Sequence, residues 1–417
     1  MSSGRGAVAE YVGAFFKLSR DVRLFLLSTV VSGLCYMGLY FLLFNLYLLR
    51  LGYDLEFIGV FVSVGAFSFA LFSLPAGMAG RRFGSRKAMI FGMVVLTLGL
   101  GMLSIAAWVP VTWRSLWLIF FCALREFGNS FYLVNSSPYL MSATAATERD
   151  FAFSLRGTLT PIAGFLGTLI GGFLPQLSES YLHWSADDPA NYMAPLILSS
   201  LLLLPGVVAL CMTREVAVDI GERALETAER GAMPLMLLLP IAAVSALFVV
   251  AASAGQTFYG VYMDTVLKTP TQLIGLVASC GQLMTAATML LAPVLMARWG
   301  HAGTFVRMGI CMGLSLLPMA LLPHWLAVGA SLVGVVVMMT FASTALTVFH
   351  QELVPVGWRP AMSGASLMAM GVGWGIVSSG GGYFVAAWGW ALFYLLASGG
   401  TLLGIGVFFW RFGLKKR

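Results

Sequence analysis

Twelve long apolar runs dominate this sequence and limit what it can fold into. Each run has roughly the 20 apolar residues that a helix needs to cross the hydrocarbon core of a bilayer, and short polar or glycine- and proline-containing segments separate the runs. The predicted spans are 24–49, 58–79, 88–109, 116–140, 153–174, 192–212, 234–262, 272–297, 304–322, 325–349, 361–387 and 390–410. We therefore expect an all-α membrane protein with 12 transmembrane helices, because a helix satisfies its backbone hydrogen bonds within one segment.

Composition excludes a soluble globular protein. Of the 417 residues, 59% are hydrophobic and only 10% are charged, whereas roughly a quarter are charged in a soluble domain. The 47 glycines suit closely packed membrane helices. The net charge of +7 comes from basic residues spread through short loops, which does not indicate a nucleic-acid partner, and the five scattered cysteines have no metal-ligand spacing.

The basic residues predict the orientation of the spans. With twelve spans, one side of the membrane, including both chain ends, carries 20 of the 24 Lys and Arg residues, and the other side carries only Arg50, Arg114 and Lys268. Loops rich in Lys and Arg stay in the cytoplasm. We therefore expect a multi-pass protein of the plasma (inner) membrane with both termini cytoplasmic.

An internal repeat divides the chain into two halves. A shift of 216 residues aligns 58–84 with 274–300 without a gap and superimposes glycine, serine and arginine positions. We predict two pseudo-symmetric six-helix bundles, 1–212 and 233–417, joined by a cytoplasmic linker, 213–232. The polar linker suits a surface helix or, alternatively, a partner-binding segment. Parallel six-span repeats are typical of transporters with a site near the membrane midplane, although a duplicated scaffold without transport has the same pattern.

The loop after the second span resembles the signature of the major facilitator superfamily, and the resemblance extends over essentially the whole chain. Gly77, Arg82, Gly84 and Arg86 match that signature, whereas Arg81 stands where the family has an aspartate. In the family this loop latches the two bundles together on the cytoplasmic side, so the resemblance implies a conformational latch here. The alternative is that these basic residues only enforce topology.

The fourth predicted span contains the adjacent charged residues Arg125 and Glu126. Placing an arginine in the membrane costs at least about 2.5 to 3.5 kcal/mol, so it requires water, a partner or a function. The segment is similar to the fourth-span motif of proton-coupled family members, an arginine followed shortly by a glycine. Glu126 is the only carboxylate deep in a predicted span and adjoins a buried cation, so we expect it to be the proton carrier if the protein is proton-coupled. The alternative is a structural pair that pins helices. Because successive helical residues diverge by about 100°, we expect one side chain to face a cavity and the other a neighbouring helix.

The fifth predicted span resembles the family's antiporter motif. Gly167, Gly171 and Gly172 match its glycines, whereas Ala163 and Thr168 replace a glycine and a proline. Small residues at this spacing form a flat helical face. The resemblance implies that these glycines pack the two bundles together.

The resemblance also implies a substrate cavity lined by the first, fourth, seventh and tenth spans. Its candidate polar or amphipathic residues are Tyr36, Tyr40, Asn45, Arg125, Asn129, Tyr132, Gln256, Tyr259, Ser343, Thr344 and Thr347. Such a lining suits a mostly apolar ligand with a few polar atoms, or one anion paired with Arg125. Alternatively, these groups hydrogen-bond helices to one another.

These observations predict a secondary transporter rather than an enzyme. The sequence has no phosphate-binding loop for ATP, no serine-nucleophile motif and no metal-ligand spacing, so we expect neither cofactor nor metal. We expect alternating access with proton-coupled efflux of a hydrophobic or amphipathic small molecule. The expected partners are that substrate, protons and membrane lipids, with a monomeric chain. The alternatives are a nutrient or organic-anion importer or facilitator, and a non-transporting membrane assembly factor.

Overall fold

The computed structural model describes residues 18–145, 148–182, 188–214, 235–354 and 359–413. Within these ranges the chain is helical almost throughout and contains no strand. The first bundle consists of α2 (Arg20–Ser32), η1 (Gly33–Tyr40), α3 (Phe41–Arg50), α4 (Leu55–Phe83), α5 (Ser85–Ser104), η2 (Ile105–Trp108), α6 (Val111–Ala143), α7 (Arg149–Leu182), α8 (Ala190–Leu201) and α9 (Leu204–Cys211). The second bundle consists of α11 (Leu235–Phe248), α12 (Val250–Thr265), α13 (Thr271–Ser315), α14 (Leu317–Leu321), α15 (Trp325–Glu352), α16 (Arg359–Trp388), α17 (Trp390–Phe408) and η4 (Phe409–Gly413).

The helices match the expected fold of a membrane protein. In the described ranges, 10 helical stretches are long and apolar enough to cross a bilayer. Helices α6 and α16 are not among them, although they have 33 and 30 residues. The charged and amide side chains of α6 and the many glycines and serines of α16 lower their hydropathy. The structure thus confirms an all-α membrane protein built from two helical bundles.

Capping residues and glycines set the turns between helices. The Asp54 carboxylate accepts a hydrogen bond from the Phe57 backbone N–H at 2.9 Å and caps the start of α4. Gly84 and Gly300 have positive φ values of 95° and 69°, which glycine adopts without steric cost. Gly84 separates α4 from α5, and Gly300 divides α13 into two helices. The two glycines are 216 residues apart, so the repeat reproduces the same turn in each half.

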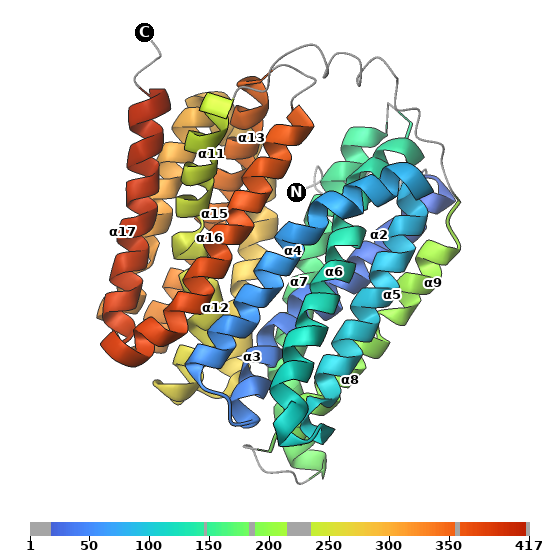
Figure 1. Cartoon of the computed structure of the whole chain (residues 1–417), viewed down its shortest axis with the longest axis vertical. Coiled ribbons are helices and arrows are strands. Elements are labelled where there is room, and N and C mark those ends of the chain that lie inside the picture. Colours follow the sequence, from blue (N-terminus) through green and yellow to red (C-terminus); the bar gives the residue numbers. More distant parts are fainter. Residues whose placement is uncertain (1–17, 146–147, 183–187, 215–234, 355–358, 414–417) are drawn as a thin grey trace, which may run out of the picture.

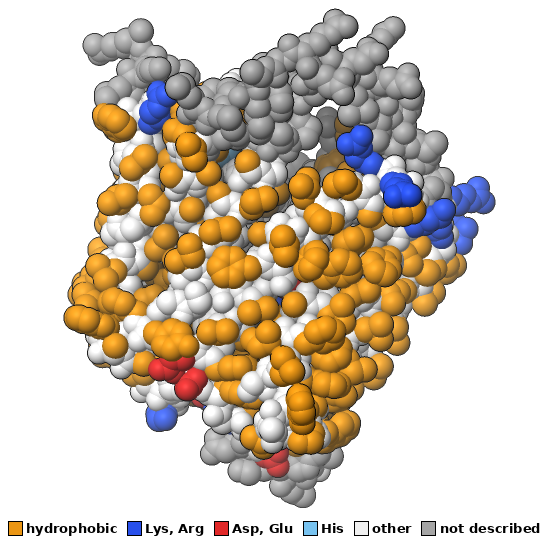
Figure 2. All heavy atoms as spheres, in the orientation of Figure 1, with side chains coloured by type: hydrophobic (Ala, Val, Ile, Leu, Met, Phe, Trp, Pro, Cys, Tyr) orange, Lys and Arg blue, Asp and Glu red, His pale blue; other side chains and the backbone are white. Residues whose placement is uncertain are grey.

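The charges gather at the ends of the helices. Figure 1 shows the two bundles side by side, with helices of both running between the same two ends. On the face shown in Figure 2, hydrophobic side chains cover the middle, most of the visible Lys and Arg side chains lie at the upper end, and acidic side chains appear at the lower end. We call the end with Arg20, Arg82, Arg86 and Arg411 the basic end, and the other the closed end.

Two pairs of helices form the seam between the bundles, α4 with α16 and α7 with α13. Gly59 of α4 lies against the backbone oxygen of Ser378 in α16, where a Cβ would clash. A Cβ on Gly275 of α13 would lie 2.7 Å from the Cα of Gly172 in α7. Because Gly59 and Gly275 are equivalent in the sequence repeat, the duplicated glycine allows the same close approach in each half.

Polar contacts join the bundles toward the closed end. Asn45 donates to the backbone oxygen of Thr257 at 3.0 Å, and the Tyr192 hydroxyl lies 3.1 Å from Thr271 Oγ1. An ion pair between the ends of α3 and α12 adds to these contacts. The bundles diverge toward the basic end (Figure 1). The arrangement is therefore a state sealed at the closed end.

Two sequence-based predictions concern segments that the structure describes only in part. The linker 213–232 lies outside the described residues except for Thr213 and Arg214. Both chain ends, 1–17 and 414–417, also lie outside them. The first and last described helices, α2 and α17 with η4, have their outer ends at the basic end (Figure 1).

Candidate functional site: a cavity between the bundles

A cavity of about 320 Å³ lies between the two bundles. Its walls are mostly aromatic and aliphatic, with a small number of polar groups, which is the usual character of a small-molecule site. The lining residues come from η1, α3, α4 and α6 of the first bundle and from α12 and α16 of the second, with Val249 beside α12. A ligand in this cavity would contact both bundles at once.

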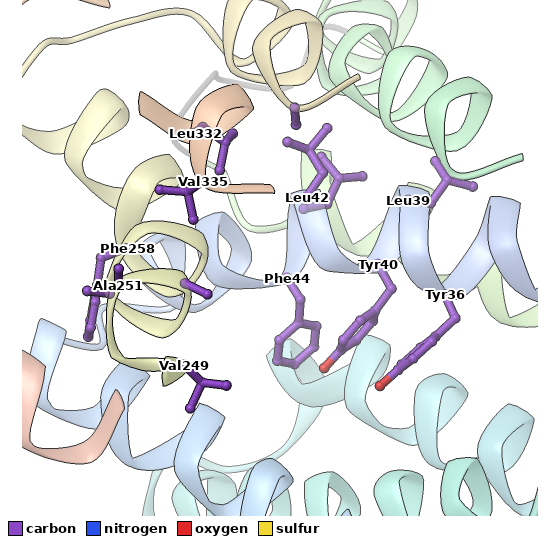
Figure 3. Close-up of a cluster of buried hydrophobic side chains, with 14 of the residues drawn as sticks. Tyr36, Leu39, Tyr40, Leu42, Phe44, Val249, Ala251, Phe258, Leu332 and Val335 are labelled. Carbon is purple, nitrogen blue, oxygen red and sulfur yellow. The ribbon is translucent and has the colours of Figure 1, made fainter. Parts of the chain in front are cut away.

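Three aromatic side chains from the first span form one wall. Figure 3 shows Tyr36, Tyr40 and Phe44 projecting to the same side, whereas Leu39 and Leu42 of the same segment point to the other side. The Tyr36 and Tyr40 rings are stacked at 5.9 Å, and the Tyr40 and Phe44 rings at 4.7 Å. Spacing of four residues keeps side chains near one face of a helix. We call these three residues the aromatic wall.

The aromatic wall begins in a π-helix that the sequence did not predict. Residues Gly33–Tyr40 form η1, and the α-helical geometry resumes at Phe41. The wider i→i+5 turn rotates less than about 100° per residue, so it changes the direction in which Tyr36 points relative to Phe44. Backbone atoms of Gly38 and Gly167 approach so closely that a Cβ on Gly38 would lie 2.5 Å from the Gly167 Cα. Helix α7 thus packs directly against η1.

Arg125 and Glu126 form a buried ion pair on the wall that α6 contributes. Arg125 Nη2 lies 2.5 Å from Glu126 Oε1, and the two residues are 5% and 6% exposed. The same Oε1 accepts the Tyr36 hydroxyl at 2.6 Å, and Oε2 accepts Asn129 Nδ2 at 2.9 Å. The carboxylate therefore has three donors from two helices, as a buried charge requires.

The expectation that Arg125 and Glu126 would meet separate surroundings is wrong. Both side chains line the cavity and they bind each other. Their Cα–Cβ bonds diverge by about 100°, but the long, flexible arginine side chain folds back toward the glutamate. In a low-dielectric setting two opposite charges are strongly attracted, which outweighs the direction set by the backbone.

Aromatic rings surround the guanidinium of Arg125. Its Cζ lies 4.6 Å from the centre of the Tyr40 ring, 5.6 Å from that of Tyr36 and 6.0 Å from that of Phe61. Such cation–π contacts stabilise a desolvated cation. In the described part of the chain, the Tyr40 hydroxyl and Arg125 Nε are buried atoms without a hydrogen-bond partner.

Glycines on two neighbouring helices make room for the pair. A Cβ on Gly65 of α4 would lie 3.2 Å from Arg125 Nη2 and 3.5 Å from Glu126 Cγ. On α5, a Cβ on Gly99 would lie 2.9 Å from the Arg125 Cα. Larger residues at either position would displace α6 or its side chains. These glycines carry a packing role that the sequence alone did not reveal.

The structure brings together some of the predicted cavity residues and separates others. The cavity lining includes Tyr36, Tyr40, Asn45, Arg125, Asn129 and Gln256. The remaining predicted residues, Tyr132, Tyr259, Ser343, Thr344 and Thr347, are not part of it.

Each of the separated residues has another environment in this state. The Tyr132 hydroxyl lies 3.3 Å from Ser28 Oγ inside the first bundle, and Tyr259 packs against the hydrophobic core. Ser343, Thr344 and Thr347 donate to backbone oxygens one turn earlier in α15. These three bonds stay within α15, so in this state they neither line the cavity nor join one helix to another.

The second and eleventh spans supply lining residues that sequence reasoning missed. From α4 come Phe61, Val62, Gly65, Ala66 and Phe69, and from α16 come Leu367, Met370, Gly371 and Trp374. In this state α4 and α16 cross between the bundles, where a Cβ on Gly371 would lie 3.0 Å from the Ala70 Cβ. The repeat included Gly65, but an apolar run alone does not show which face meets a cavity.

The fifth-span glycines contact two different partners. Gly167 and Gly171 pack against the first span, where a Cβ on Gly171 would lie 3.2 Å from Leu39 Cδ2. Only Gly172 of the three faces the other bundle, through Gly275. Because helical residues spaced four apart share a face, Gly167 and Gly171 lie together and Gly172 is rotated by about 100°. In this state the interbundle role thus fits Gly172 and not the other two.

Among the described residues, the contacts of the predicted latch residues in this state lie within the first bundle. Arg86 donates to the Cys211 backbone oxygen at 2.6 Å and to Thr213 Oγ1 at 3.2 Å, at the end of the sixth span. The Arg82 guanidinium lies 5.2 Å from the centre of the adjacent Phe83 ring, and Gly84 forms the turn. A Cβ on Gly77 would meet Val134 at 3.6 Å. A latch across the bundles stays a prediction.

Comparison with known proteins places the fold among transporters. The Major Facilitator Superfamily profile matches residues 25–378. No curated protein matches the chain in sequence. Among solved structures, a single-site mutant of the nucleoside transporter NupG is 15% identical with a TM-score of 0.72, and the match covers 94% of this chain and 100% of that one.

Two further structures of the same fold are transporters. A POT family transporter in complex with 5-aminolevulinic acid is 14% identical with a TM-score of 0.73, covering 95% of this chain and 97% of the other. A D-xylose–proton symporter is 14% identical with a TM-score of 0.73, covering 93% and 96%. At such identities the likeness concerns the fold. Together with the match over most of the sequence and the cavity between two bundles, it shows that this chain is a membrane transporter, not an enzyme, and belongs to the major facilitator superfamily.

Proposed function

We propose that this transporter couples the movement of an amphipathic, mostly apolar small molecule to proton movement, with Glu126 as the proton carrier. The observation that carries the proposal is the buried Arg125–Glu126 pair in the wall of the interbundle cavity. Buried ionisable pairs inside membrane proteins mark ion and proton pathways. One structure of the same fold is described as a proton symporter.

A proton on Glu126 would change the contacts of three neighbouring side chains. The carboxylate now accepts bonds from Arg125, Tyr36 and Asn129. A protonated carboxyl group accepts fewer bonds and loses its attraction for Arg125. Because Tyr36 belongs to the first span and Arg125 to α6, protonation alters how these two elements hold each other beside the cavity.

The cavity and the distribution of charges support one direction of transport, from the basic end to the closed end. The basic end carries most of the Lys and Arg residues, and such ends face the cytoplasm. With the bundles joined at the closed end, a substrate would enter from the cytoplasmic side in this state. We therefore propose export, in which substrate loads at the basic end and a proton enters from the closed end after the bundles rock.

The geometry favours this function over that of an organic-anion importer. Arg125 would supply the countercharge for an anion, but its Nη2 is bound to Glu126 and its guanidinium lies among aromatic rings. The other cavity residues are uncharged. An anion would thus meet a guanidinium whose charge the Glu126 carboxylate already neutralises.

Proteoliposomes with an imposed pH gradient test the proposal. We expect the wild type to move amphipathic aromatic compounds faster when the gradient drives protons toward the basic end. In Glu126→Gln the acceleration by the gradient should be smaller by about tenfold or more. The variant should still exchange substrate without a gradient. Glu179→Gln, which changes an exposed carboxylate near the closed end, is the matched control.

Two outcomes would overturn the proposal. Equal acceleration of wild type and Glu126→Gln by the gradient would remove Glu126 as carrier. Flux that responds to a gradient of an organic anion, and is lost in Arg125→Ala for anions alone, would favour the importer.

A further inference from the structure

Gln256 carries a carboxamide that the protein leaves largely unused inside the cavity. It lies in α12, is partly buried and lines the cavity from the side of the second bundle. Its one hydrogen bond to the described residues runs from Nε2 to Met339 Sδ at 3.6 Å. A thioether sulfur is a weak acceptor, so Oε1 and the second N–H of Gln256 have no strong partner among the described residues.

The other two carboxamides of the cavity are engaged. Asn45 donates to the Thr257 backbone oxygen at 3.0 Å and so helps to close the seam. Asn129 donates to Glu126 Oε2 at 2.9 Å and to the Tyr36 hydroxyl at 3.4 Å. Both therefore serve the protein's own structure. Gln256 differs because its Oε1 and its second N–H remain available to a ligand in the cavity.

The charge of the cavity excludes a strongly charged ligand in this state. Arg125 and Glu126 are the charged residues among those lining it, and they neutralise each other at 2.5 Å. An ion entering the apolar space would lose its hydration without gaining a countercharge. An uncharged ligand avoids this cost.

The walls indicate the shape of the ligand. The aromatic wall lies on the first bundle, Phe61 stacks on Phe44 at 5.0 Å, and Trp374 lines the cavity from α16. Aromatic surfaces favour flat apolar groups in stacked or edge-on arrangements. Gln256 lies on the second bundle, so a flat molecule with a polar edge would contact both bundles.

We infer that the cavity binds an uncharged, flat aromatic molecule with a hydrogen-bond donor and acceptor side by side, and that Gln256 recognises this amide-like edge. A carboxamide presents a donor and an acceptor together and pairs with a complementary edge through two hydrogen bonds. The inference rests on the proposed transport function and specifies the substrate class. Gln256 then determines the substrate specificity, whereas Glu126 carries the proton.

Four naphthalene probes with different polar groups test the inference at equilibrium. They are 2-naphthamide, the acceptor-only ester methyl 2-naphthoate, the anion 2-naphthoate and the cation 2-naphthylmethylammonium. Binding is measured by calorimetry on the full chain in lipid nanodiscs, with empty nanodiscs as background. We expect 2-naphthamide to bind the wild type about tenfold more tightly than the ester, because it makes one more hydrogen bond, and both charged probes to bind more weakly.

Two substitutions of Gln256 give opposite expected changes. Gln256→Met keeps the length of the side chain and should abolish the tenfold preference for the amide, with ester binding changed by less than about twofold. Gln256→Glu should shift the preference to 2-naphthylmethylammonium, a gain that misfolding cannot produce. Gln272→Met, which alters a glutamine near the closed end outside the cavity, should retain the wild-type pattern.

The inference is overturned if neither neutral probe binds the wild type, if a charged probe binds most tightly, or if Gln256→Met retains the amide preference. These assays need no gradient and no transport. Failure of proton coupling in Glu126→Gln liposomes would therefore leave the binding pattern intact. Conversely, loss of the Gln256 pattern with intact proton-driven flux would reject only the substrate class.

Discussion

Arg50 and Asp264 join the two bundles through a bidentate ion pair. Arg50 Nη1 donates to Asp264 Oδ2 and Nη2 to Oδ1, each at 2.8 Å, and the side chains are 18% and 11% exposed. Arg50 ends α3, and Asp264 lies near the end of α12. The two residues are 214 positions apart, close to the repeat of 216, so equivalent spans meet across the seam. A planar fork of this kind fixes geometry as well as adding energy.

Breaking this pair should open the closed end. We expect Asp264→Asn to destabilise the present state by about 1.5 to 3 kcal/mol, because a hydrogen bond to a charged group has about that value. Distances between spin labels at the closed end should then shift toward longer values. Glu179→Gln should leave them unchanged, and exchanging the charges through Arg50→Asp with Asp264→Arg should restore part of the closed population. An unchanged distance distribution in Asp264→Asn would contradict a gating role.

The glycine contact between α7 and α13 gives a second prediction. A Cβ on Gly275 would lie 2.7 Å from the Gly172 Cα, whereas one on Gly281 would meet no described atom within 4 Å beyond its own turn of helix. An added methyl group in a well-packed contact lowers the stability of that packed state by about 1 to 3 kcal/mol. Gly275→Ala should therefore lower transport several-fold, and Gly281→Ala in the same helix should not. Equal transport rates in proteoliposomes for both variants would contradict this prediction. They would show that α7 and α13 accommodate the extra methyl group without a loss of free energy.

Two tyrosines of the aromatic wall should respond differently to loss of their hydroxyls. The Tyr36 hydroxyl donates to Glu126 at 2.6 Å, whereas the buried Tyr40 hydroxyl has no partner in the described part of the chain. Tyr36→Phe should lower the free energy of unfolding by about 1.5 to 3 kcal/mol and so lower the melting temperature. Tyr40→Phe should be neutral or slightly stabilising. Thermal unfolding of both variants in one detergent checks this order, and the reverse order would contradict the described hydrogen bonding.

The basic loop offers a separate test of the latch. Arg86 binds Cys211 and Thr213 in this state, whereas Arg82 contacts only the neighbouring Phe83 ring among the described residues. Arg86→Gln should lower the melting temperature. Arg82→Gln should leave it unchanged but slow transport, if Arg82 contacts the second bundle when the basic end closes. If Arg82→Gln transports at the wild-type rate with unchanged topology, the latch role is contradicted. The basic loop would then only set the orientation of the protein in the membrane.

The repeated features were the ones that sequence reasoning found most readily. Gly84 and Gly300 were aligned by the repeat and both have positive φ in the structure, a conformation that glycine adopts without steric cost. Gly59 and Gly275 were aligned too, and both meet the opposite bundle. The sequence, however, did not reveal their partners.

The cavity was harder to predict because it depends on contacts between distant residues. Tyr36 and Asn129 were expected in it and lie there, but Ser343 bonds within its own helix, and Trp374 of α16 was missed. Helical periodicity gives the relative direction of side chains within one span. It does not give the rotation of that span against its neighbours, which depends on packing.

The amino-acid sequence by itself determined that the chain lies in a membrane, where its helical spans fall, that its two halves are repeats and which family it resembles. Each of these follows from local hydrophobicity, turn residues and residue spacing along the chain. Only the tertiary structure decided that Arg125 and Glu126 bind each other, that Arg50 reaches Asp264 and that Gln256 remains largely unpartnered among the described residues. These relations join helices far apart in sequence or depend on side-chain bending. They arise from the crossing and rotation of packed helices, which no single span encodes.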